Sequence, residues 1–130
     1  MNMKLMNKIG TAALVVATLA CTIPTAMAHH SGAEFDMSKT VEIQGTVKEF
    51  QFKNPHTWIQ VMVADPKGGS VEWSLEWGSP NALGRQGYRP TTFPIGAKVT
   101  VRMNPMRTGG PAGAFVGAKF EDGKTVGTWN

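Results

Sequence analysis

The distribution of apolar and polar residues changes near residue 41, from an irregular segment to one with a period of two. From Val41 to about Phe52 the two kinds of side chain alternate, and Gly45 interrupts the apolar series. Such alternation indicates a strand with one buried and one solvated face. A glycine within the strand permits the sharp bend that a small closed barrel needs. We therefore predict a bent first strand over 41–52.

Four further apolar stretches predict strands, each bounded by turn-forming residues. Asn54-Pro55 ends the first strand, because proline cannot donate a ladder hydrogen bond and restricts the residue before it. The stretch at 71–77 alternates most regularly, and Trp73 and Trp77 share its apolar face. That face favours core packing for both tryptophans over a stacking platform for a ligand. The expected strands are 57–64, 71–77, 98–103 and 114–121.

Ser79-Pro80 predicts the start of a short helix, because serine caps a first turn and proline fits the first helical position. Gly84 and Gly87 are expected stops after about two turns. Three strands, a helix and two more strands are the order of a five-stranded Greek-key barrel of the OB type. We therefore predict an all-β, OB-like barrel with one short helix between strands three and four. A small open sandwich is the alternative, but closure would remove its exposed strand edges.

Residues 1–28 have the pattern of a cleaved signal peptide. Lys4 and Lys8 lead into an apolar stretch, and Ala26 and Ala28 supply the small residues of an A-x-A cleavage site. This pattern predicts a periplasmic or secreted protein. No later apolar run approaches the roughly 20 residues of a membrane span, so no transmembrane segment is expected in the mature chain. The expected organisation is a signal peptide over 1–28, an N-terminal arm over 29–40 and the barrel domain over 41–130.

The cysteine content and the net charge limit the classes of function that the protein can have. Cys21 is the only cysteine and lies in the predicted leader, so packing rather than a disulfide would stabilise the exported domain. In an alternative interpretation Cys21 is lipidated and tethers the chain, although Thr18 is smaller than the residue usual in a lipobox. The net charge of +4 includes Lys4 and Lys8 of the leader. The remaining charge is too small to indicate a nucleic-acid partner.

Several short motifs occur along the chain after the leader: His29-His30-Ser31, Phe35-Asp36, Gly45-Thr46-Val47, Asn54-Pro55-His56, Trp73, Ser79-Pro80 and the segment 83–87. Taken together they resemble a family of small exported bacterial proteins known as domain of unknown function 6152. The resemblance covers essentially the whole mature chain. It implies a secreted single domain and no established activity, so functional inference rests on the residues.

His29, His30 and His56 are the only histidines. After cleavage, the α-amine and Nδ1 of His29 can chelate one metal ion, and an imidazole from His30 or His56 would complete the T-shaped arrangement that suits Cu(II). His56 follows the Asn54-Pro55 turn, at a loop end that an N-terminal arm can reach. The alternative is that all three histidines are ordinary polar surface residues. Acidic candidates for hydrogen bonds to these imidazoles are Glu34 and Asp36, which otherwise are solvated acids.

Methionines add a second kind of metal ligand. Met103 and Met106 offer thioethers to Cu(I), because soft sulfur selects the soft ion. Met62 and Trp58 are further candidates, the latter through attraction of a cation to the indole face. The alternative is that methionines at strand ends fill gaps in the core.

The competing hypothesis is an interaction module that needs no metal. Trp58 and Trp77 could contact an envelope protein or glycan, and Arg85 and Arg89 could hold a small anion. Alternatively, these two arginines are solvated residues at the rim of the barrel.

Motifs of the common enzyme classes do not occur in the sequence, among them a nucleophile beside its base, a phosphate-binding loop and a zinc-protease helix. The leading hypothesis is therefore a non-enzymatic, periplasmic copper-binding protein that carries or buffers the metal. A redox enzyme with copper bound at the terminal histidine is a third, minor hypothesis.

Overall fold

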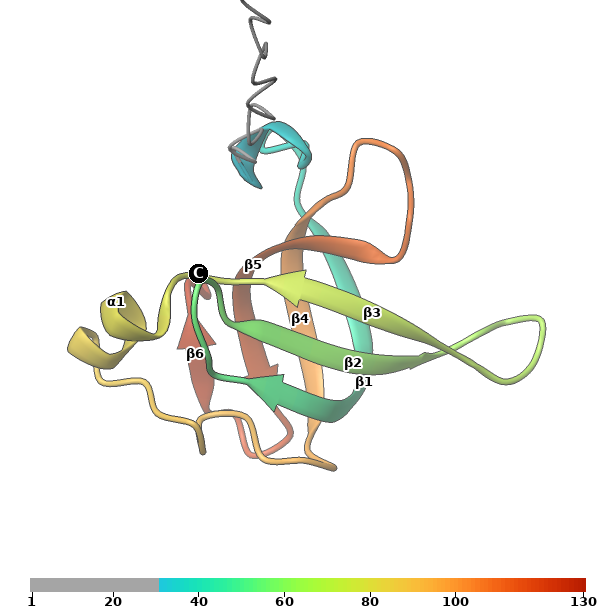
Figure 1. Ribbon diagram of the computed structural model, residues 1–130. Helices are drawn as coiled ribbons and strands as arrows, with labels where there is room; N and C mark the ends of the chain where they lie inside the picture. Colours follow the sequence, from blue (N-terminus) through green and yellow to red (C-terminus); the bar gives the residue numbers. More distant parts are fainter. Residues whose placement is uncertain (1–30) are drawn as a thin grey trace, which may run out of the picture.

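The computed structural model describes residues 31–130, which form six strands, one α-helix and one short 3-10 turn (Figure 1). The predicted leader, with His29 and His30, lies outside the described residues. Within residues 31–130, no helix is both long and apolar enough to span a bilayer. The elements are η1 (Ser31–Ala33), β1 (Val41–Gln51), β2 (Trp58–Ala64), β3 (Ser70–Glu76), α1 (Pro80–Arg85), β4 (Lys98–Pro105), β5 (Ala112–Phe120) and β6 (Thr125–Gly127).

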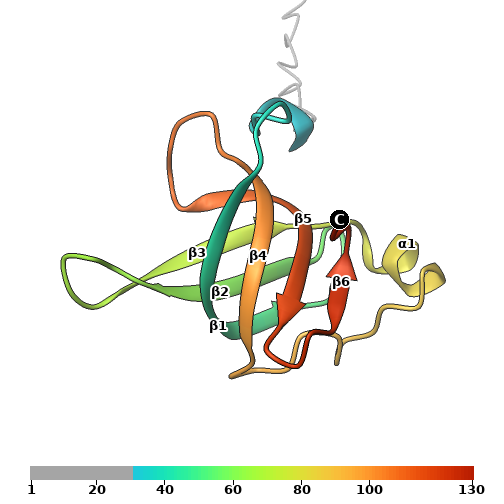
Figure 2. The same cartoon turned by 180° about the vertical axis from the view of Figure 1, so that it is seen from behind.

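The first five strands form a closed barrel, which Figures 1 and 2 show from opposite sides. Antiparallel pairing gives the order β3-β2-β1-β4-β5, and a short parallel pairing of β3 with β5 joins the two ends. With α1 inserted between β3 and β4, this is the OB topology. The predicted OB-like barrel is therefore confirmed, and the open sandwich is not formed.

The bend predicted at Gly45 is present in β1. The first half of β1, up to Thr46, pairs with β4, while the second half turns to pair with β2. A side chain at position 45 would overlap the carbonyl oxygen of Met62 and lie 2.8 Å from a methyl group of Val61. Glycine therefore allows two strand backbones to approach where the barrel turns its corner.

The core fills the barrel interior with the inward positions of the strands. Ile59, Leu75 and Val101 have no exposed surface, and Trp73 and Trp77 pack against the same cluster. The expectation that both tryptophans serve the core is confirmed. Leu83 of α1 and Phe93 of the following loop are also buried. The full buried cluster is Val47, Ile59, Val61, Leu75, Phe93, Val99, Val101, Met103, Phe115, Ala118 and Val126.

The ends of the strands differ from the sequence-based expectation in identifiable ways. β4 continues to Pro105, because proline lacks only the donor and its carbonyl still accepts the amide of Asp36 at 2.8 Å. β5 begins at Ala112, two residues before the expected start. The expected tail contains a sixth strand, β6, whose three residues are too few for a periodic pattern; its Val126 is buried against the core.

Gly45→Ala should destabilise the barrel by about 2–3 kcal/mol, because the added methyl group must displace the backbone of β2. Denaturant unfolding of the protein measures this change. The matched control is Gly84→Ala in α1, where nothing lies within 4 Å of the new carbon. That variant should be neutral or up to about 1 kcal/mol more stable. Equal stability of both variants would contradict the role given to Gly45.

Candidate functional site

The segment before β1 is tied to the barrel rather than extended into solvent. Phe35 is only 3% exposed and forms an isolated β-bridge with Met106, just beyond the end of β4. The amide of Asp36 donates to the carbonyl of Pro105. The buried Phe35 is therefore the apolar residue that anchors the arm to the barrel.

Arg107 and Asn104 hold the arm on either side of that anchor. The amide of Arg107 donates to the carbonyl of Glu34 at 2.9 Å, and its Nε donates to the carbonyl of Ala33 at 3.2 Å. The buried side-chain amide of Asn104 donates to the carbonyl of Lys39 at 2.7 Å. Arg107 thereby fixes the path of the arm beside the barrel. The arm, blue-green in Figure 1, consequently runs close to the β4–β5 loop.

Asp36 closes a turn within the arm. Its carboxylate accepts from the hydroxyl of Ser38 at 2.6 Å and lies 3.2 Å from Nζ of Lys39. The Ser38 hydroxyl, followed by Lys39, lowers the pKa of Asp36 below its usual 3.8. A lowered pKa means that these bonds are complete above pH 3.8 and are lost as the pH falls through the lowered value. In the described structure the Asp36 carboxylate therefore orders the arm rather than an imidazole.

A cavity of about 400 Å³ lies between this arm and the adjoining end of the barrel. We call it the arm cavity. Gly32 and Met37 line it from the arm, His56 from the β1–β2 loop, and Glu76 and Trp77 from the end of β3. The cavity thus brings together an imidazole, a carboxylate and a thioether from three separate parts of the chain.

His56 and Glu76 form the polar pair of the arm cavity. Nδ1 of His56 lies 2.5 Å from Oε1 of Glu76, and the Glu76 side chain is only 11% exposed. A carboxylate can only accept, so Nδ1 carries the hydrogen. In the neutral imidazole, Nε2 is then the nitrogen with a free lone pair. Metal-binding histidines commonly have this arrangement, in which a carboxylate orients the ring from the opposite nitrogen.

The backbone beside His56 fixes this pair. The amide of Thr57 donates to the carbonyl of Gly78 at 3.0 Å, and the amide of Trp77 donates to the carbonyl of Thr57 at 2.8 Å. These bonds hold the start of β2 against the end of β3, where Trp58 pairs with Glu76. His56 therefore lies directly before a backbone segment that hydrogen bonds fix to the end of β3.

The described candidate residues occupy different places. Met103 fills the barrel core with no exposed surface, whereas Met106 is half-buried beside Phe35; neither lines the arm cavity. Arg85 is exposed at the last turn of α1. Nη1 of Arg89 donates to the carbonyls of Gly84 and Tyr88.

Trp58 and Trp77 do not form a joint surface. Trp77 packs against Tyr88 and Phe115 with ring centroids 4.7 and 4.6 Å apart. Ile59, next to Trp58, points into the core, so Trp58 points to the outer face of the sheet. The structure therefore does not bring the two proposed contact residues together.

Two residues of the arm cavity were missed by sequence reasoning. Glu76 belongs to the polar set of an alternating strand, which predicts a solvated side chain, and Met37 lies in an irregular segment. The sequence feature that could have indicated a role for Met37 is its proximity to His29 and His30. Within residues 31–130, no three His, Cys, Asp or Glu side chains are grouped closely enough to hold a metal ion. A metal in the arm cavity therefore needs donors beyond His56 and Glu76.

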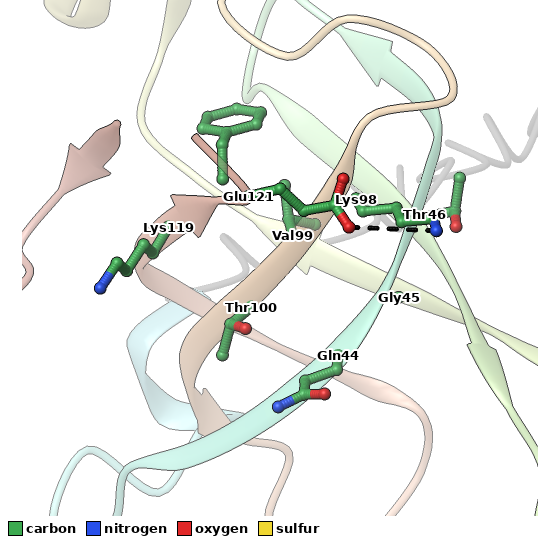
Figure 3. A pocket seen from close by; sticks show the side chains of 9 residues that line it. Gln44, Gly45, Thr46, Lys98, Val99, Thr100, Lys119 and Glu121 are labelled. Atoms are coloured by element: carbon green, nitrogen blue, oxygen red, sulfur yellow. Dashed lines mark ion pairs between the residues drawn. The ribbon is translucent and has the colours of Figure 1, made fainter. Parts of the chain in front are cut away.

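A second concavity lies on the outer face of β1, β4 and β5 (Figure 3). Polar side chains line it, among them Gln44 and Thr100, which are labelled in Figure 3. The charged groups Lys98 and Glu121 approach each other at 3.9 Å and are both largely exposed. This surface is open and solvated, and its opposite charges partly neutralise each other.

Comparison with known proteins assigns the family. The sequence pattern of a family of unknown function, DUF6152, matches residues 15–115. The chain belongs to the DUF6152 family. Among solved structures, this DUF6152 protein is similar to a mitochondrial single-stranded DNA-binding protein of S. cerevisiae, Rim1, with 11% sequence identity and a TM-score of 0.45. The similarity covers 64% of this chain and 94% of that chain, and no curated protein sequence matches this one.

Phe35→Ala should release the arm of this DUF6152 protein while the barrel stays folded. The amides of Asp36 and Arg107, which join arm and barrel, should exchange with solvent at least about tenfold faster. Hydrogen exchange followed by NMR measures this, with the amide of Ile59 as the barrel reference. The control Met37→Ala changes an exposed neighbour and should leave the exchange unchanged. Unaltered protection in Phe35→Ala would show that Phe35 does not anchor the arm.

Proposed function

We propose that this protein is an exported, non-enzymatic copper-binding module that holds Cu(II) in the arm cavity. The observation that carries the proposal is that Gly32, three residues after His29, lines the same cavity as His56. Covalent geometry limits the distance between the Cα atoms of His29 and Gly32 to about 11 Å. A chain that begins at His29 therefore has its terminus within reach of the arm cavity.

The donors available there match the demands of Cu(II). The α-amine and Nδ1 of His29 form one chelate, and Nε2 of His56 adds a third nitrogen, with His30 as the alternative second imidazole. Three nitrogens in a plane suit the tetragonal preference of Cu(II). Glu76 supports this set, because its bond to Nδ1 leaves Nε2 of His56 for the metal.

The proposal depends on removal of residues 1–28. Cleavage after Ala28 creates the α-amine of His29, whereas lipidation at Cys21 would leave His29 inside the chain and without it. Release into the periplasm and a role in carrying or buffering copper follow from the predicted signal peptide.

Arg89 favours a second candidate function, the binding of a small anion. Its Nη1 is fixed by two backbone carbonyls at 2.9 and 2.7 Å. Arg89 also lines a separate cavity of about 470 Å³, together with Lys124 and Tyr88. A guanidinium held beside a lysine can bind a carboxylate or phosphate. This function needs no metal and would persist in the presence of a chelator.

The processed chain, beginning at His29, should bind one Cu(II) ion and lose that affinity when the terminus is blocked. Acetylation of the α-amine of His29 keeps every side chain but removes the chelate, so affinity should fall by more than about 100-fold. Glu76→Gln should lower affinity by about 10–100-fold by disturbing the orientation of His56. Competition titration measures the affinities, and quenching of tryptophan fluorescence reports occupancy beside Trp77.

The matched control is Thr100→Ala on the opposite, solvated face, which should bind Cu(II) as the unmodified chain does. His56→Ala should resemble the blocked terminus. Equal copper affinity in the unmodified chain, the acetylated chain and His56→Ala would refute the proposed site.

A further inference from the structure

Met37 is an exposed apolar side chain at the mouth of the arm cavity. Its surface is 58% exposed, and only Val41 and Ile95 are other large hydrophobic residues classed as exposed within residues 31–130. Met37 lines the same cavity as His56, whereas Met62, Met103 and Met106 do not. Because so little of the Met37 side chain is buried, it contributes little to folding. Met37 is therefore a candidate for a role that uses its sulfur atom.

The backbone around Met37 is held on both sides. Phe35 is anchored in the barrel end, and the amide of Asp36 is bonded to Pro105. On the other side, the amide of Lys39 donates to the carbonyl of Asp36 at 3.0 Å. Met37 therefore projects from an ordered turn, while its three rotatable bonds let the thioether adjust to a bound ion.

The chemistry of the cavity differs for the two oxidation states of copper. Imidazole binds both ions, whereas a thioether is a soft donor that selects Cu(I). We propose that the arm cavity also binds Cu(I), with Sδ of Met37 and Nε2 of His56 as ligands. This inference rests on the proposed function and extends it from Cu(II) to Cu(I).

The two ions would use overlapping but different ligands. Cu(II) takes the amine and imidazole of His29 together with His56, while Cu(I) takes His56 together with Met37. Glu76 orients the shared imidazole in both cases. Loss of the terminal amine would therefore weaken Cu(II) binding more than Cu(I) binding.

The test compares both ions in Met37→Leu, which removes the sulfur and retains an apolar side chain of similar volume. Cu(I) affinity is measured without oxygen by competition with bicinchoninate, and Cu(II) affinity by competition titration in air. Met37→Leu should weaken Cu(I) binding at least tenfold and leave Cu(II) binding within twofold. X-ray absorption at the copper edge should show a sulfur neighbour in the Cu(I) form of the unmodified chain and none in Met37→Leu.

Met62→Leu is the matched control, because Met62 is half-buried on β2 outside the cavity and should leave both affinities unchanged. Normal Cu(II) binding with equal Cu(I) affinity in Met37→Leu and the unmodified chain would overturn this inference alone. Cu(I) binding that depends on Met37, without any Cu(II) binding, would overturn the terminal chelate and keep the inference. Absence of binding to either ion would overturn both.

Discussion

The parallel pairing of β3 with β5 is the constraint on which the rest of the molecule depends. It joins 74–76 to 112–114 and turns an open sheet into a barrel. Gly113 in this seam also allows β5 to lie close to β4, since a side chain there would lie 2.8 Å from the carbonyl oxygen of Asn104. The pairing also sets Glu76 beside Ala114, and both residues line the arm cavity. Closure of the barrel therefore supplies the β5 side of the candidate site.

The arm forms the remaining wall of the candidate site at this end of the barrel. Phe35 is buried where β4 ends, and Arg107 binds the carbonyls of Ala33 and Glu34. These contacts fix the path of residues 33–36 beside the end of the barrel. A barrel without the arm would leave His56 and Glu76 as a half-exposed surface pair. With the arm in place, they share a cavity with Met37 and with the segment that leads back to His29.

The strands could be predicted from the sequence, because apolar and polar residues alternate with the same period of two as the buried and solvated faces of a strand. The bend at Gly45 and the core positions of Trp73 and Trp77 follow from such local rules. The pairing of His56 with Glu76 could not be predicted, because it joins a loop to the outer face of a strand 20 positions later. An acidic residue in an alternating strand is ordinarily expected to be solvated, and only the antiparallel pairing of β2 with β3 brings Glu76 to its partner His56. The proposed terminal chelate would depend on cleavage of one peptide bond, which is a matter of processing rather than of folding.

Paramagnetic broadening in the NMR spectrum of the processed chain tests the central claim most directly. Substoichiometric Cu(II) broadens the signals of nuclei close to the ion and leaves distant ones sharp. The account predicts selective loss of signals from Gly32, His56 and Gly78 around the arm cavity, with Thr100 on the opposite face unaffected. Broadening centred elsewhere, or none at a copper concentration equal to that of the protein, would contradict a copper site between the terminal histidine and His56.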